Sequence, residues 1–302
     1  MARILSRVAP WLPSAPSRRL EGERLTGTIR VLGASDTGPL GELVARDPVA
    51  NVFIDAQLTA SGSAAPTSSG GMVLGRFDGG TLDSACWVGA NVVPIEASAE
   101  AAVEFADAIL PLGRRFSSVF GLSEAVLSIW SRLQDGPQRA FDIRARQPLM
   151  ILDHAPPAGP ATGLRPTLES DYDAVLPACA RMFEEELGYS PLTGGGSYYR
   201  SRVRSLIRQG HSLVDFDASG AVRFKAELGT VSPRATQIQG VWMDPRHRGR
   251  GLAAPYMAAV AGYALSLAPV TSLYVNDYNA AALATYRRVG FRQAGEFATV
   301  LF

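Results

Sequence analysis

The chain reads Val241-Trp242-Met243-Asp244-Pro245-Arg246-His247-Arg248-Gly249-Arg250-Gly251-Leu252-Ala253-Ala254 where an apolar strand meets an Ala-rich helix. The first N–H groups of a helix have no internal partner, and the helix dipole places positive potential there. Gly249 and Gly251 lack side chains that would keep a ligand away from these groups. The three arginines of the turn add charge that pairs well with phosphate. The stretch predicts a pyrophosphate-binding turn, although strand, glycine turn and helix also occur together in proteins without a ligand.

A second pattern follows downstream. Residues 272–276 read Ser-Leu-Tyr-Val-Asn, which predicts a short buried strand. Asn279 then opens a helix that ends at Gly290-Phe291, a C-cap glycine followed by a return to strand. The apolar positions of this helix recur at helical spacing: Ala280, Leu283, Ala284 and Tyr286.

These two patterns resemble the GNAT superfamily of N-acetyltransferases. Arg248-Gly249-Arg250-Gly251-Leu252-Ala253 fits that family's Gln/Arg-x-x-Gly-x-Gly/Ala signature. The downstream run of Asn276, Asn279, Tyr286 and Gly290-Phe291 resembles the end of a GNAT domain. The resemblance covers roughly residues 162–302, about one domain. It implies an α/β (α+β) fold with a mixed, largely antiparallel sheet.

The upstream segments fit the same fold. Thr167 is expected to cap a helix that runs through Glu186 and ends at Gly188. The remaining elements are expected as a helix over 198–208, a hairpin of strands 212–216 and 221–228, and a strand over 236–243.

The first half of the chain repeats this order of elements. Strands are expected at 29–32, 72–77, 82–88, 91–95, 117–120 and 147–152, and helices at 37–46, 49–60, 99–110 and 124–133. We therefore predict a diverged, GNAT-like copy; the alternative is an unrelated α/β domain. Where the turn should lie, residues 94–100 contain two carboxylates and no glycine, so we expect no cofactor site there. This half also resembles an uncharacterised domain that precedes GNAT domains in some bacterial acetyltransferases, through residues 47–53, 89–91 and 146–149.

The predicted organisation has four parts. Residues 1–24 form a flexible tail, residues 25–152 the degenerate N-terminal domain, residues 153–163 a Pro/Ala/Gly linker and residues 164–302 the acetyltransferase domain. A signal peptide is not expected, because Arg7, Pro10 and Pro13 interrupt any apolar core.

The resemblance implies acetyl-CoA as acyl donor, with no metal. The diphosphate would lie on the amides of Arg248, Gly249, Arg250, Gly251, Leu252, Ala253 and Ala254. The pantetheine arm would pair with Val241-Trp242-Met243, where Trp242 or Met243 would donate an N–H to the thioester carbonyl. Asn279 matches a position that bonds the cofactor arm, or it is only a helix cap.

Tyr286 occupies the family position of the general acid, since a phenol keeps its proton at neutral pH; the alternative is a packed aromatic. The general base is left open. Glu227 could accept the proton, or water held by Gln237 or Gln239 could relay it. The amine could also arrive already neutral. The acceptor side is expected at Glu184, Glu185 and Tyr189. The acidic residues there would attract a cationic amine; the alternative is a solvated acidic face.

Composition supports a protein with a sizeable core. The 302 residues include 47% hydrophobic residues at a net charge of +1. We expect no nucleic-acid or membrane partner, a cytoplasmic location, a monomer or homodimer, and a small-molecule or peptide amine as acceptor. Cys86 and Cys179 are expected as buried free thiols rather than a disulfide or a nucleophile. The alternative function is a CoA-binding sensor or scaffold with little turnover.

Overall fold

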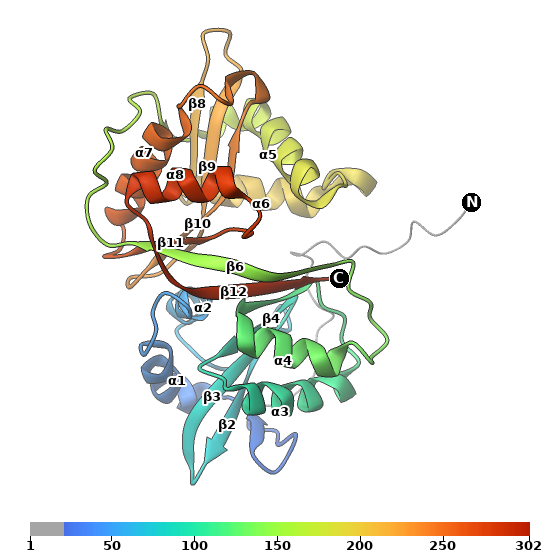
Figure 1. The fold of residues 1–302 in the computed structure, drawn as a ribbon. Coiled ribbons are helices and arrows are strands. Elements are labelled where there is room, and N and C mark those ends of the chain that lie inside the picture. The colour runs from blue at the N-terminus through green and yellow to red at the C-terminus, as the bar shows by residue number, and fades with distance from the viewer. Residues whose placement is uncertain (1–20) are drawn as a thin grey trace. The chain divides into compact units, whose positions relative to one another are not determined.

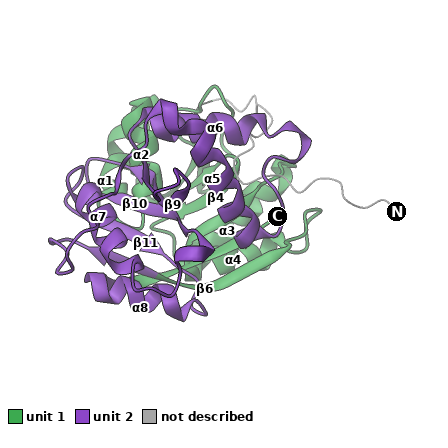
Figure 2. Cartoon of the chain, turned by 90° about the horizontal axis from the view of Figure 1, so that it is seen from above, with its two compact units in different colours: residues 1–148, 295–302 green, residues 149–294 purple. Residues whose placement is uncertain are grey.

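The computed structural model describes residues 21–302, so most of the predicted N-terminal tail lies outside the described residues. The chain divides into two compact units (Figure 2). Unit 1 contains residues 1–148 and 295–302, and unit 2 contains residues 149–294.

Unit 1 alternates strands and helices in the predicted order. Its elements are β1 (Ile29–Val31), α1 (Thr37–Val44), α2 (Val52–Ser61), β2 (Met72–Asp78), β3 (Thr81–Val88), β4 (Asn91–Ile95), α3 (Ala99–Ile109), β5 (Ser118–Leu122) and α4 (Ser123–Leu133). The strand β6 (Asp142–Leu152) begins in unit 1 and ends in unit 2.

Unit 2 has the same sequence of elements. They are β7 (Arg165–Pro166), α5 (Tyr172–Leu187), α6 (Ser197–Arg208), β8 (Ser212–Phe216), β9 (Val222–Val231), β10 (Thr236–Met243), α7 (Ala253–Leu265), β11 (Thr271–Tyr274) and α8 (Ala280–Val289). The strand β12 (Arg292–Leu301) begins in unit 2 and ends in unit 1.

The two sheets share one topology. In unit 1, β1 to β4 pair antiparallel in chain order and β4 pairs parallel with β5. In unit 2, β7 to β10 pair antiparallel in chain order and β10 pairs parallel with β11. The prediction that the first half repeats the fold of the second is therefore confirmed.

The sixth strand of each sheet comes from the other half of the chain. In unit 1, β12 pairs antiparallel with β5 from Phe297↔Leu122 to Leu301↔Ser118. In unit 2, the end of β6 pairs antiparallel with β11 at four positions, Leu149 to Leu152. The sequence groups residues 147–152 with the first half and residues 292–302 with the second, so these pairings are not among the predictions made from it. Both carry a buried apolar run, and such a run does not specify which sheet it joins.

Helices cover both faces of each sheet. In unit 1, α3 and α4 lie side by side (Figure 1) and form one core with strand residues such as Val92, Val119 and Val300. On the other face, α1 and α2 pack on Leu32, Leu82 and Ile95. In unit 2, α7 and α8 pack over β9 to β11, while α5 contacts β9 and β10 alongside α6.

One predicted cap is wrong and one is confirmed. The hydroxyl of Thr167 lies 2.8 Å from that of Ser212, and both are buried. The helical segment instead begins at Glu169, and the Asp171 carboxylate accepts from the N–H of the preceding Leu168 at 2.8 Å. Asn279 caps α8 by accepting from the Ala282 N–H at 3.1 Å. Among the described residues, no helix has both the length and the apolar composition of a bilayer crossing.

We expect Phe302→Ala to destabilise unit 1. Phe302 is buried against Trp130 of α4, with ring centroids 5.8 Å apart, and such a truncation costs about 3–5 kcal/mol. Hydrogen exchange followed by mass spectrometry should show faster exchange in β5 and α4. Phe291→Ala is the matched control, because Phe291 packs in the core of unit 2. Faster exchange in α7 and α8 for Phe302→Ala, with unit 1 unchanged, would contradict the strand exchange.

Candidate functional site

The turn before α7 leaves its backbone open. Asp244 caps the short helix η5 (Pro245–His247) by accepting from the Arg246 N–H at 2.8 Å. Gly249 and Gly251 follow with φ of +73° and +74°, a region that L side chains rarely adopt. No heavy atom lies within 4 Å of the position that a Cβ would take at either glycine. The N-terminus of α7 is therefore approachable by an anion.

Two of the three arginines in this turn are already engaged. Arg246 donates to both carboxylate oxygens of Asp244 at 3.0 Å. Arg248 donates to the Met243 carbonyl at 2.8 Å and to Glu185 at 2.7 Å. Among the described residues, Arg250 has no side-chain hydrogen bond or ion pair. The turn thus offers main-chain amides and one uncommitted guanidinium to a ligand.

The strand that feeds this turn separates from its neighbour. β10 pairs with β11 only at Thr236↔Thr271 and Gln237↔Ser272. On its other side β10 follows β9 to Met243, with register shifts after Gln237 and after Gln239. Gly240, inside the second shift, has φ of +59°. The edge of β10 beyond Gln237 faces no paired strand, so its amides can accept an extended ligand.

Tyr286 lies on α8, which packs against α7. The side chain is buried, and its ring is 6.0 Å from that of Phe291. Burial, and then the negative charge of Glu186, raises the pKa of Tyr286 to about 12. The phenol therefore holds its proton throughout the neutral range and could give it to a leaving group.

A buried ion cluster joins β9 to α5 and α6. Lys225, the only lysine of the chain, is fully buried and donates to Glu227. Its Nζ also lies 3.4 Å from Cys179 Sγ, and Arg202 lies 3.5 Å from the other oxygen of Glu227. Neither Lys225 nor Arg202 is among the site residues predicted from the sequence. The signal was available: a lysine and a glutamate two apart on a strand share one face.

Charge pairing sets the protonation of this cluster. Burial alone would raise the pKa of Glu227, but Lys225 and then Arg202 outweigh it and lower that pKa. Burial alone would lower the pKa of Lys225, but the neighbouring thiol and carboxylate raise it overall. Burial raises the pKa of Cys179 to about 11, which leaves a thiol rather than a nucleophilic thiolate.

The acidic end of α5 contacts the turn. Glu185 accepts from the Trp242 indole at 3.0 Å as well as from Arg248. Glu184 is exposed, and the Tyr189 ring packs edge-on against Phe183 at 5.2 Å. Of the three predicted acceptor residues, Glu185 thus lies with the predicted cofactor residues of β10 and the turn.

The remaining candidate side chains are Gln237, His247 and the two cysteines. Gln237 is buried on β10 opposite Thr230. His247 Nε2 lies 3.6 Å from Asp217 at the base of the turn. Cys86 and Cys179 are both buried and unbridged, as the sequence predicts. Among residues 21–302, no three His, Cys, Asp or Glu side chains gather as metal ligands would.

The corresponding turn of unit 1 is closed by its own residues. Glu96 takes φ of +51°, a rare conformation for a side chain with a Cβ. Its carboxylate accepts from the buried Asn51 amide at 2.8 Å. Ser98 then caps α3 by accepting from the Ala101 N–H at 3.2 Å.

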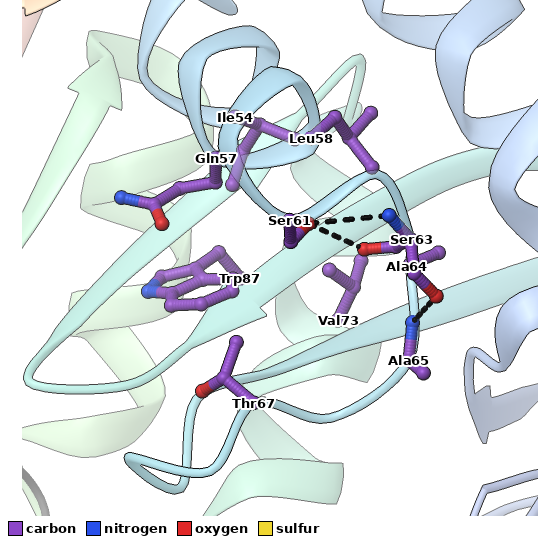
Figure 3. A pocket seen from close by; sticks show the side chains of 10 residues that line it. All are labelled: Ile54, Gln57, Leu58, Ser61, Ser63, Ala64, Ala65, Thr67, Val73 and Trp87. Carbon is purple, nitrogen blue, oxygen red and sulfur yellow. Dashed lines mark hydrogen bonds between the residues drawn. The ribbon is translucent and has the colours of Figure 1, made fainter.

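A pocket of unit 1 lies elsewhere, between α2 and the strands β2 and β3 (Figure 3). Ser61, Thr67, Val73 and Trp87 contribute to its lining, and the Ser61 hydroxyl accepts from the Ser63 N–H and donates to its carbonyl. The cavity volume is about 10 Å³, space for about one water. It is far too small for a cofactor.

Sequence comparison matches the two halves to different families. Residues 197–291 match the acetyltransferase (GNAT) family. Residues 71–175 match a domain of unknown function, DUF4081. No curated protein matches the chain at a significant level.

Several solved structures share the fold over nearly the whole chain. A GNAT-family acetyltransferase from Colwellia psychrerythraea is 11% identical, with 91% of this chain and 99% of that chain covered at a TM-score of 0.54. A Drosophila protein is 14% identical, with 91% and 98% covered at a TM-score of 0.60. A tandem GNAT protein from the clavulanic acid biosynthesis pathway is 17% identical, with 90% and 97% covered at 0.52.

We expect Lys225→Met to lower the free energy of unfolding by about 3–5 kcal/mol, because it leaves the buried Glu227 without its lysine partner. The double variant Lys225→Met/Glu227→Gln should lose less than the sum of the two single changes. Urea unfolding of the four proteins measures the coupling. Strictly additive losses would show that the two charges do not stabilise each other.

Proposed function

We propose that the C-terminal part of the chain, whose residues 197–291 match the acetyltransferase (GNAT) family, moves an acetyl group from acetyl-CoA to a primary amine by direct attack in a ternary complex. When bound, acetyl-CoA supplies the acetyl group as a thioester. The observation that carries the proposal is the junction of an unpaired strand edge on β10 with an open glycine turn at the start of α7.

The binding residues follow from this junction. The amides from Arg248 to Ala254 would hold the diphosphate, with Arg250 as the guanidinium free to approach it. The edge of Val241-Trp242-Met243 would pair with the amide groups of the pantetheine arm. The fit is supported by the room above Gly249 and Gly251, where any Cβ would occupy the ligand's place.

Two groups would act on the reacting atoms. The N–H of Trp242 or Met243 would donate to the thioester oxygen as negative charge develops on it. Tyr286 would then give its proton to the departing sulfur. The raised pKa of Tyr286 supports this role, because the acid stays protonated across the working pH range.

Of the open choices for the general base, the charges of Lys225 and Arg202 around Glu227 favour a water relay at Gln237. A carboxylate whose pKa is lowered by two cations is a weak base at neutral pH, which makes Glu227 a poor proton acceptor. We therefore assign Glu227 to positioning Arg202 and Lys225, and proton removal to water near Gln237 or to bulk solvent.

Unit 1 would bind no acyl-CoA. Glu96 and Glu100 place negative charge at its turn, and Glu96 is held there by Asn51. A carboxylate at this position would repel a diphosphate. We propose that one acetyl-CoA binds per chain, and the role of unit 1 in the reaction is structural.

Gly251→Ala should weaken acetyl-CoA binding at least tenfold. The new methyl group would lie where the diphosphate approaches, and its residue would be strained at φ of +74°. Calorimetry gives the dissociation constant. Gly262→Ala is the matched control, since Gly262 lies within α7 with nothing within 4 Å of its Cβ position. Equal affinity for the Gly251 variant and the control would remove the turn from the binding site.

Tyr286→Phe should lower kcat by about a hundredfold or more, because a positioned general acid contributes about that much. The dissociation constant of acetyl-CoA should not change, since the ring remains packed against Phe291. Steady-state release of CoA thiol from pH 6 to pH 10, with calorimetry beside it, tests both. Unaltered turnover with intact binding would leave Tyr286 as a packed aromatic.

A further inference from the structure

A polar groove runs along α6 in unit 2. Its volume is about 320 Å³, within the range of small-molecule sites. Most of its lining side chains are polar, and one wall position is a glycine on β9. The lining includes Tyr198, Ser201, Arg202, Ser205, Gln209 and Gly229.

The floor of this groove adjoins the strand that carries the register shift. A Cβ at Gly229 would lie 2.0 Å from Cδ of Gln239, so the Gln239 amide rests directly over the glycine. Gln239 pairs in register with Glu227, and the Glu227 carboxyl carbon lies 3.0 Å from the Cβ position of Gly240. The groove therefore meets the shifted segment of β10 where Gln239 rests on Gly229.

The charge balance of the groove is positive. Lys225 and Arg202 face a single carboxylate, Glu227, so the cluster carries one surplus positive charge. The side chain of Arg202 is 29% exposed, whereas Lys225 is 0% exposed and Glu227 6%. The surplus charge is therefore presented to the groove by Arg202.

The rest of α6 does not compensate this charge. The helix reads Ser-Tyr-Tyr-Arg-Ser-Arg-Val-Arg-Ser-Leu-Ile-Arg, with four arginines and no acidic residue. Arg204 stacks on the Tyr172 ring at 4.2 Å, and Arg208 pairs with Glu169 at 3.4 Å. Neither lines the groove.

We propose that this groove binds the acceptor, and that the acceptor is an amine that carries a carboxylate, held by Arg202. The inference rests on the acetyltransferase function proposed above. Glu227 keeps its bond to Lys225, so the forked guanidinium has donors left for a second carboxylate. A polyamine, with positive charge only, is disfavoured beside the same guanidinium.

The experiment compares amines that differ by a carboxylate: phenylalanine with phenethylamine, lysine with cadaverine, and glycine with methylamine. Release of CoA thiol is measured at saturating acetyl-CoA for wild type, Arg202→Gln, Arg202→Lys and Arg208→Gln. We expect kcat/KM to be at least tenfold higher for the carboxylate member of each pair that reacts. Arg202→Gln should remove that preference by raising KM, and Arg202→Lys should restore part of it.

Arg208→Gln is the matched control, an identical change on the same helix at an exposed ion pair, and should keep the preference. Calorimetry with acetyl-CoA and thermal unfolding accompany each variant. A preference for the carboxylate-free amines, a preference that survives Arg202→Gln, or no reaction in any pair while acetyl-CoA binds would each overturn the acceptor class. Absence of acetyl-CoA binding to wild type would instead overturn the proposed function itself.

Discussion

The separation of β10 from β11 is the constraint on which the rest of unit 2 depends. Two paired positions, at Thr236 and Gln237, hold these parallel strands together, and beyond them the amides of β10 have no strand partner on that side. Unpaired strand amides are costly when buried, so such an edge is kept only where something else satisfies it. The register shift at Gly240 directs this edge toward the turn at Gly249 and Gly251. Between the two, the N–H groups of Asp244 and of residues 246–248 are bonded within the protein, so the open main-chain donors lie in two stretches, one on β10 and one at the glycines.

A comparison of the two units shows which features come from the backbone fold and which come from the residues of the turn. In unit 1, β4 and β5 also pair at only two positions, Asn91↔Ser118 and Val92↔Val119. The strand separation is therefore present in both copies. The copies differ at the turn, where unit 1 has Glu96 in a strained conformation bonded to Asn51. The fold alone supplies the opening between strands. In unit 2 the glycines would make the turn suitable for a diphosphate, since its carboxylates Asp244 and Glu185 are paired with arginines.

The order of elements could be predicted from local signals, because turns and caps are encoded by neighbouring residues. Asn279 capping α8 and the hairpin between β8 and β9 are examples. The exchange of the last strands could not be predicted, since Leu149–Leu152 and Phe297–Leu301 are buried apolar runs that fit either sheet. Thr167 failed as a cap because a hydroxyl distant in sequence, on Ser212, is its partner. Tertiary partners of this kind leave no local pattern.

Tertiary partners also determine what the arginines of the turn can do. Their spacing suggests three charges for a phosphate, yet Asp244 and Glu185 engage two of them. The Arg248–Glu185 pair is exposed and adds little stability, but it holds Arg248 against the Met243 carbonyl at the end of β10. We infer that Arg246 and Arg248 mainly fix the conformation of the turn and contribute less as positive charges for a ligand. Recognition of a diphosphate would then rest on oriented amides, whose geometry is fixed by the glycines.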